Sequence, residues 1–280
     1  MEGNDPVINR ACGKRLEEVM RILVTGPRGF VGARIVQAMD AVPAPPLRNA
    51  TEDDVRRLVD KVEPDVVVHT AAISDIGACA ANPEASHHAN VALPLMIART
   101  GVKSVLFSTD QVYSGCAGVG PYAEDEVAPA NLYAEHKLEM EKRVLDVNPD
   151  AVLLRATWMY DMPLYGVPNR FNFLVGMLRA RELAFSGTAH RAVTYVREVA
   201  AHMAHAVALP GGVYNYGSEN DLTMLETARW LKEELKLDVA LSDAGPKHNL
   251  WMDCGKLKGQ GILFKDTLGG LKQCIRDYGL

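Results

Sequence analysis

Four short runs of apolar and β-branched residues recur along the first half of the chain. They lie at 21–26 (RILVTG), 65–72 (DVVVHTAA), 104–110 (SVLFSTD) and 151–157 (AVLLRAT). Each run is apolar at consecutive positions rather than at alternate ones, which is typical of strands that helices cover on both faces of a parallel sheet. We therefore expect these runs to be neighbouring strands of one buried sheet.

Helical patterns separate these strands. Apolar positions recur with helical spacing at 30–39, 52–62, about 85–99 and from residue 131 onward, and Thr51 is placed to cap the second of these helices. A chain that alternates strands and helices in this way predicts an α/β fold with a doubly wound parallel sheet, the Rossmann arrangement.

The second strand is the weak point of this pattern. It should fall within 41–49 (AVPAPPLRN), where three prolines stand close together. Because proline cannot donate a hydrogen bond to a neighbouring strand, we expect only a very short or edge-like strand there.

The alternation breaks after residue 160, which indicates a second, smaller unit. We expect a loop over 160–172, isolated strands near 183–187 and 213–217, and a helix over 221–237 that begins at Asp221 or Thr223. The assignment is an N-terminal extension at 1–19, a dinucleotide-binding Rossmann domain at 20–160 and roughly 188–217, and an interleaved C-terminal α/β substrate lobe at 161–187 and 218–280. Open α/β sheets bind ligands beyond the carboxyl ends of their strands, so a cleft is expected there.

A glycine-rich turn follows the first predicted strand directly. Its glycines have the spacing G-x-x-G-x-x-G, and a predicted helix starts within it. The first glycine permits the tight turn, the second lets a pyrophosphate approach the backbone, and the third lets the helix pack on the strand, while the helix N-terminus favours negative charge. The predicted cofactor-binding residues of this turn are Gly26, Arg28, Gly29, Phe30, Val31 and Gly32.

The residues after the second strand bear on the choice of cofactor. A carboxylate that binds the ribose of NAD should lie about 20 residues beyond the glycines. Positions 46–49 are instead Pro, Leu, Arg and Asn. An arginine suits a 2′-phosphate better than a ribose diol, so Arg48 and Arg28 favour NADP(H). If both are ordinary surface arginines, NAD(H) stays open.

The helix predicted from residue 131 carries a lysine in its apolar stripe. Tyr133, Lys137, Met140 and Val144 lie on one face of this helix, and an unpaired buried ammonium is unfavourable. A cation one turn from a tyrosine favours the phenolate, which would let Tyr133 exchange a proton near neutral pH while cofactor hydroxyls satisfy Lys137. The alternative is a lysine that extends to solvent beside a packed tyrosine.

Further polar residues lie where the same cleft is expected. The strand at 104–110 ends in Ser-Thr-Asp, the segment 69–75 ends another strand with small residues, and Asn90 lies in a helix expected to face the cleft. These features favour the catalytic interpretation of Tyr133 and Lys137.

With these motifs the sequence resembles the extended short-chain dehydrogenase/reductase family, and within it the dTDP-4-dehydrorhamnose reductase branch. The resemblance runs from about residue 21 to about residue 260 and rests on VTGPRGFVG, PDVVVHTAA, FSTDQVYSG, APANLYAEHKLEMEK, LLRATWMY and VREVA. The string STDQVY is similar to that of the reductases. Dehydratases of the family place Asp-Glu after the threonine, and epimerases favour a serine-rich string.

The resemblance implies roles for individual residues. Thr109, Tyr133 and Lys137 would be the catalytic set. Further cofactor-binding residues would be Ala71, Ala72, Asn90, Tyr133 and Lys137, and substrate-binding residues would be Ser74, Asp110, Gln111, Trp158 and Arg191. Gln111 stands where the reductases usually have an aromatic residue, which leaves the identity of the sugar open. The C-terminal stretch 245–262 lacks the Arg-Pro that is usual in the family.

The activity that the resemblance implies is NAD(P)H-dependent reduction of a nucleotide-linked 4-keto-6-deoxy sugar, with Tyr133 as proton donor. Two alternatives stay open. The regulatory subunit of methionine adenosyltransferase retains the fold and can keep the catalytic residues, and nucleotide-sugar epimerases and dehydratases share the fold but regenerate their cofactor. Dimers are common in the family, so a homodimer is compatible with the resemblance.

Composition narrows the classes of protein to which the chain can belong. The 280 residues are 48% hydrophobic and carry a net charge of −5, without the basic face expected of a nucleic-acid or membrane-surface protein. No apolar run reaches transmembrane length, and residues 1–19 lack the apolar core of a secretory signal. Five scattered cysteines without a C-x-x-C pair argue against disulfides or zinc and favour the cytoplasm, and no bound metal is expected.

Overall fold

A computed structural model of the protein describes residues 20–163 and 171–280. The predicted extension at 1–19 and residues 164–170 of the predicted loop lie outside them. Among the helices of the described ranges, none combines the length and the apolar character needed to cross a membrane.

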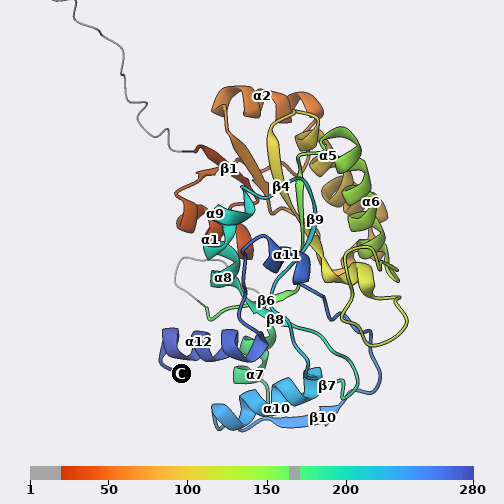
Figure 1. Ribbon diagram of the computed structural model, residues 1–280, viewed down its shortest axis with the longest axis vertical. Helices are drawn as coiled ribbons and strands as arrows, with labels where there is room; N and C mark the ends of the chain where they lie inside the picture. Colours follow the sequence, from red (N-terminus) through yellow and green to blue (C-terminus); the bar gives the residue numbers. More distant parts are fainter. Residues whose placement is uncertain (1–19, 164–170) are drawn as a thin grey trace, which may run out of the picture.

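Six parallel strands form the central sheet (Figure 1). In chain order they are β1 (Ile22–Thr25), β2 (Val42–Pro43), β3 (Val66–His69), β4 (Lys103–Thr109), β5 (Val152–Ala156) and β9 (Gly212–Tyr216), and their order across the sheet is β2-β1-β3-β4-β5-β9. The four strongly predicted strands are therefore neighbours. Every residue of β1 and β3 is buried, as their consecutive apolar residues require. The predicted doubly wound α/β fold is confirmed.

Helices cover both faces of this sheet (Figure 1). One face is covered by α1 (Phe30–Met39), α8 (Val196–Ala201) and α9 (Met203–Ala206), and the other by α2 (Glu52–Val62), α5 (Leu93–Ala98) and α6 (Leu132–Val147). Successive residues of β1 pack against the two helical layers: Val24 packs in the core with Ile35 of α1, whereas Leu23 packs with Val55 of α2. The sheet is thus buried on both sides.

Prolines shape two of the elements. β2 is two residues long and lies at the edge of the sheet beside β1, as the prolines of 41–49 predict. The single helix expected over about 85–99 is instead α4 (Pro83–His87), a π-helical turn η1 (His88–Ala92) and α5. Pro94, the second residue of α5, has no N–H to donate to the carbonyl of Asn90, so the regular hydrogen bonding is broken where η1 meets α5.

A smaller unit packs at the carboxyl ends of the strands (Figure 1). Its strands are β6 (Trp158–Tyr160) paired with β8 (Val193–Tyr195) and β7 (Glu182–Phe185) paired with β10 (Ala240–Asp243), and its helices are α7 (Phe173–Arg179), α10 (Met224–Glu234) and α12 (Thr267–Tyr278). These elements share a second hydrophobic core. The remaining helical elements are α3 (Ile76–Ala81), η2 (Asp110–Tyr113) and α11 (Gly255–Gly259).

The boundary between the two units passes through 188–217. β9, α8 and α9 belong to the layers of the central sheet, whereas β8 packs in the core of the smaller unit. Of the two caps predicted for the helix over 221–237, Thr223 is the one used. Its side chain accepts from the backbone of Glu226, and Glu226 bonds back to the cap.

Candidate active site

A cleft of about 770 Å³ lies at the carboxyl ends of the strands, between the central sheet and the smaller unit. Its walls are the glycine turn, the segment after β3, the end of β4 with η2, the first turns of α6 and the residues after β5. The predicted site residues that line it are Gly29, Phe30, Val31, Ala72, Ser74, Thr109, Asp110, Gln111, Tyr133, Lys137, Trp158 and Arg191. Predicted cofactor, catalytic and substrate residues therefore share one cavity.

The glycine turn has the backbone that a pyrophosphate site requires. Gly26 has a φ of 72°, and a Cβ there would lie 2.8 Å from the backbone nitrogen of Ala71. A Cβ at Gly32 would lie 2.2 Å from the carbonyl oxygen of Gly26, so only glycine lets α1 pack on the turn. Gly29 caps α1 without a side-chain acceptor, and the first turn of the helix faces the cleft at Phe30. The N–H groups and the dipole of this turn suit an anion.

Lys137 lies inside the protein rather than at its surface. The side chain is 1% exposed, and its Nζ donates to the carbonyl oxygen of Phe107 at 2.8 Å. Burial lowers the pKa of Lys137 to about 8, an effect that the carboxylate of Glu141 opposes. Tyr133 lies one turn earlier on the same face of α6 and is 7% exposed. The alternative of a lysine that extends to solvent is therefore wrong.

Thr109 is the last residue of β4 and is buried at the edge of the cleft. Its hydroxyl accepts from the backbone N–H of Gln111 at 3.2 Å and donates to a carboxylate oxygen of Asp110 at 3.3 Å. The amide of Asn131, the cap of α6, donates to the Gln111 side chain at 3.3 Å. Thr109 and the start of α6 are thus connected by hydrogen bonds.

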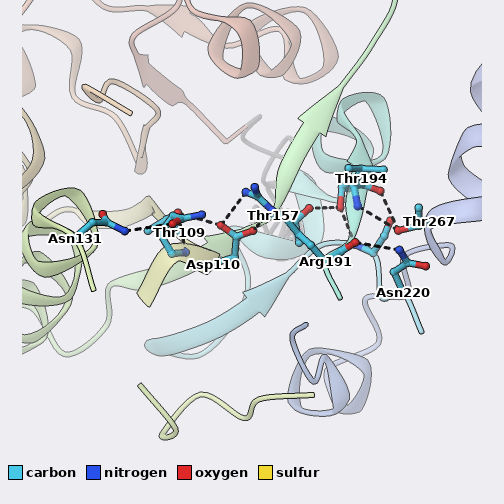
Figure 2. Close-up of polar contacts among 11 residues, drawn as sticks. Thr109, Asp110, Asn131, Thr157, Arg191, Thr194, Asn220 and Thr267 are labelled. Carbon is cyan, nitrogen blue, oxygen red and sulfur yellow. Dashed lines mark hydrogen bonds and ion pairs between the residues drawn. The ribbon is translucent and has the colours of Figure 1, made fainter. Parts of the chain in front are cut away.

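Asp110 and Arg191 form a two-point ion pair across the cleft (Figure 2). Arg191 Nε lies 2.9 Å from Oδ2 of Asp110, and Nη2 lies 3.3 Å from Oδ1. The guanidinium also lies over the ring of Trp158, 5.6 Å from its centroid. Burial raises the pKa of Asp110, and the charge of Arg191 opposes that rise. The pair is not an ordinary surface ion pair, because Asp110 is 1% exposed.

This ion pair connects the two units of the fold (Figure 2). Asp110 follows β4 of the central sheet, whereas Arg191 precedes β8 of the smaller unit. The backbone carbonyl of Arg191 accepts from the amide of Asn220 at 3.0 Å, and Thr157 and Thr194 share a hydrogen bond of 2.7 Å beside it. The walls of the cleft on the two sides are therefore fixed to one another by polar contacts.

The remaining predicted site residues, Gly26, Arg28, Gly32, Arg48, Ala71 and Asn90, are not in the cleft lining. Arg28 is exposed beside the glycine turn, and Arg48 borders a separate hollow of about 500 Å³ after β2. Asn90 is fully buried in η1, where its amide donates to the carbonyl of Ile73 at 2.9 Å and accepts from the N–H of Ile73 at 3.2 Å. It holds the segment after β3 rather than facing the cleft.

Three residues of the cleft lining, Thr70, Asp75 and Ser108, lie in the strand-end segments that the sequence placed at the cleft, but they received no role of their own. The others were not singled out from the sequence: Ile76, Gly77, Phe107, Ala156, Thr157, Met159, Phe171 and Asn172. Thr157 directly follows β5, so the rule that ligands bind beyond strand ends could have found it. Ile76 at the start of α3 and Phe171 before α7 carried no such signal, because their place depends on how helices pack.

His69, the last residue of β3, packs inside the protein. It is 1% exposed, and its Nδ1 lies 2.6 Å from the hydroxyl of Thr25. Burial and the nearby charge of Lys137 lower the pKa of His69 to about 3, so the ring is neutral at physiological pH. Within 20–163 and 171–280, no three His, Cys, Asp or Glu side chains gather as a metal site would require.

Comparison with known proteins adds sequence relatives. A family model described as the RmlD substrate binding domain matches residues 20–249. A dTDP-4-dehydrorhamnose reductase of Burkholderia thailandensis is 31% identical over 204 residues, which cover 68% of this chain and 66% of that protein. The spore coat polysaccharide biosynthesis protein SpsK of Bacillus subtilis is 24% identical over 79% of this chain and 81% of its own length. The match to the Burkholderia protein thus spans just under two thirds of that relative.

Solved structures show the same fold. A dTDP-4-dehydrorhamnose reductase of Bacillus anthracis in complex with NADP has a TM-score of 0.82 at 18% identity, over 92% of this chain and 99% of that one. The UDP-glucose 4-epimerase of Thermotoga maritima has a TM-score of 0.76 at 22% identity, over 93% of this chain and 100% of that one. At these identities the similarity shows a shared fold, and reductases and epimerases both have it.

Proposed function

The chain belongs to the family of the RmlD substrate binding domain, and from this premise we propose that it is an NADPH-dependent reductase of a nucleotide-linked 4-keto-6-deoxy sugar. The observation that carries the proposal is the meeting of Thr109, Tyr133 and Lys137 in one cleft beside the glycine turn. Relatives named dTDP-4-dehydrorhamnose reductase and dTDP-4-keto-6-deoxy-D-glucose reductase support the substrate class.

In this proposal, each residue of the cleft has its own part in the reduction of the carbonyl. Bound NADPH supplies the hydride for the keto carbon. Tyr133 donates its phenolic proton to the keto oxygen, and the hydroxyl of Thr109 donates a hydrogen bond to that oxygen. The ammonium of Lys137 stabilises the phenolate that Tyr133 becomes, and the buried position of Lys137 keeps water from screening its charge. On the substrate side, Asp110 and Trp158 contact the sugar, and Arg191 carries the positive charge that a diphosphate requires.

The cofactor fits the residues that are present. The pyrophosphate would be held by the glycine turn and the first turn of α1, where a Cβ at Gly26 or Gly32 would collide with backbone. The ribose hydroxyls would be held by the ammonium of Lys137, beside the phenol of Tyr133. We favour NADP(H) over NAD(H), because Arg28 and Arg48 are exposed near the turn and after β2, and neither position offers a carboxylate to a ribose diol.

Arg48→Glu tests the cofactor preference. The change should weaken NADPH binding about tenfold, because it replaces one charge-assisted contact to the 2′-phosphate with a repulsive charge. NADH binding should not change, and both affinities are measured by fluorescence titration. Arg179→Glu makes the same charge change at the end of α7 in the smaller unit and should alter neither. Equal losses for both cofactors in Arg48→Glu would contradict the assignment.

Gly32→Ala tests the glycine turn. The new Cβ would lie 2.2 Å from the Gly26 carbonyl oxygen, so the turn or α1 must move and NADPH affinity should fall at least about tenfold. Gly259→Ala is the matched control, because a Cβ there meets nothing within 4 Å. Calorimetric titration with NADPH measures both, and unchanged affinity in Gly32→Ala would show that the pyrophosphate binds elsewhere.

The pH dependence of turnover follows from the burial of Lys137. With a pKa of about 8, the ammonium is charged at neutral pH and loses its proton as pH rises through that value. Because Lys137 stabilises the phenolate and binds the cofactor only while charged, kcat/KM and NADPH affinity should both fall above about pH 8. A profile of kcat/KM from about pH 6 to about pH 10 measures this, and a flat alkaline side would contradict it.

NADPH consumption with a panel of nucleotide-linked 4-keto-6-deoxy sugars tests the function itself. The panel should include several nucleotides and both C5 epimers, since the sequence leaves the sugar open. NADPH binding without turnover on the whole panel would favour a regulatory subunit. A purified protein that retains tightly bound NAD and interconverts sugars without added cofactor would favour an epimerase or dehydratase.

The proposal also includes the compartment. In the described ranges Cys79, Cys116, Cys254 and Cys274 are free thiols, and Cys79 and Cys274 are fully buried. Free cysteines are usual in a reducing compartment, which supports the cytoplasm.

A further inference from the structure

The buried face of α6 carries a second charged residue after Lys137. Glu141 lies one turn further along the same face and is 2% exposed. It forms a two-point ion pair with Arg155 of β5, with Nη2 2.6 Å from Oε2 and Nε 3.0 Å from Oε1. A buried ion pair seldom adds net stability over apolar residues of the same size, so its presence suggests another role.

Glu141 and Lys137 join α6 to the end of β4 at two successive turns. Lys137 donates to the carbonyl oxygen of Phe107, and the next strand residue, Ser108, donates its hydroxyl to Glu141. Thr109 follows directly. These two contacts help to fix the register of α6 against β4, which places Tyr133 and Thr109 on the same cleft.

Arg155 holds the carboxylate of Glu141 in a fixed position. Its Nη1 donates to the hydroxyl of Tyr113 at 2.8 Å and to the carbonyl oxygen of Glu124 at 2.7 Å. The hydroxyl of Tyr113 in turn donates to the side chain of Asn215 at 2.6 Å. The guanidinium thus has partners on several sides, and neither member of the ion pair can turn toward solvent.

The groups that bear on the charge of Lys137 come from three elements. On β3, His69 is neutral at physiological pH, and on α3 the thiol of Cys79 donates to the carbonyl oxygen of Ile73 at 3.3 Å. On α6, Glu141 raises the pKa of Lys137 and so favours the ammonium. Among these described groups, Glu141 therefore has the largest influence on the charge of Lys137.

We propose that Ser108, Glu141 and Arg155 are positioning residues: they fix α6 against β4, Glu141 keeps Lys137 charged, and Arg155 limits the strength of that effect. The inference rests on the proposed function, because it assigns a role toward the catalytic lysine. None of the three residues needs to touch the reacting atoms. Their influence should appear in the pH dependence rather than only in the amount of activity.

Two single variants should move the pH profile in opposite directions. Glu141→Gln removes the negative charge, so the alkaline fall of kcat/KM should move to lower pH by about one unit. Arg155→Met leaves the Glu141 charge without its neutralising partner, so the alkaline fall of kcat/KM should move to higher pH by a similar amount. Arg155→Lys keeps a positive charge there, so its alkaline fall should return toward the wild-type pH. A purely structural role would reduce kcat in both variants without shifts of opposite sign.

Further variants keep the test informative if a single variant does not fold. The double variant Glu141→Gln/Arg155→Met removes both buried charges, so its alkaline fall should lie between those of the two singles. Glu139→Gln is the matched control: Glu139 is on the same helix, two residues away, and pairs with Arg143 at the surface. Its profile should match wild type. An alkaline fall at the same pH in every folded variant would overturn the inference.

A second readout separates this inference from the proposed function. The pH midpoint of NADPH binding, measured by fluorescence without substrate, should shift in the same directions as kcat/KM. If no nucleotide sugar is reduced, the proposed function fails, while the binding midpoint still tests the positioning role. If sugars are reduced and neither midpoint moves, the positioning role fails alone.

Discussion

Tyr133→Phe should lower kcat by about 10²- to 10⁴-fold and leave NADPH affinity nearly unchanged. The substitution removes the phenolic hydroxyl, which in the proposed reaction gives its proton to the keto oxygen. It keeps the ring, which is 7% exposed and packs at the first turn of α6. The loss should therefore appear in the chemical step, since the pyrophosphate contacts of the glycine turn remain.

The measurement is steady-state NADPH oxidation together with fluorescence titration of the cofactor. Tyr214→Phe is a suitable control, because Tyr214 is also a mostly buried tyrosine whose hydroxyl donates to a carbonyl, that of Pro210 at 3.0 Å. The Tyr214→Phe variant should lose this hydrogen bond and keep a normal kcat. Near-normal kcat in Tyr133→Phe would mean that the proton comes from another group, and the proposed mechanism would fail.

The central sheet was predictable because its signals are local. Each of the strands at 65–72 and 151–157 is a run of consecutive apolar residues, and only a strand covered on both faces needs such a run. The prolines of 41–49 act on their own backbone, so the short edge strand β2 also followed from the sequence. The π-helical turn η1 could not be predicted from the sequence, because the helical periodicity continues across Pro94.

The candidate site was predictable where it lies at strand ends and not where distant segments meet. Asp110 and Arg191 were both expected to contact substrate, yet nothing in either local pattern shows that they pair, since 81 positions separate them. The pairing depends on how the smaller unit sits on the sheet. Asn90 illustrates the same limit, because the direction of its side chain is set by the π-helical turn.

Lys137→Met should lower kcat at least about 10²-fold and also weaken NADPH binding. Methionine has a similar length and fills the same space, so the change removes the charge and little volume. The carbonyl of Phe107 loses its donor, but the cost of burying an ammonium also disappears, so the melting temperature should change by less than about 4 °C. Lys142→Met, on the exposed side of α6, should change none of these quantities. A change in melting temperature alone would make Lys137 structural.

The double variant Tyr133→Phe/Lys137→Met shows whether Lys137 promotes catalysis through Tyr133 or independently of it. In the proposed mechanism Lys137 promotes catalysis by stabilising the phenolate of Tyr133, so without the hydroxyl its charge has little left to stabilise. The kcat of Tyr133→Phe/Lys137→Met should therefore be close to that of Tyr133→Phe, and the two losses should not multiply. The loss of NADPH affinity should persist in the double variant, because the ammonium binds the ribose independently of the phenol. Multiplying losses in kcat would mean that Lys137 contributes to the chemical step by a route other than Tyr133.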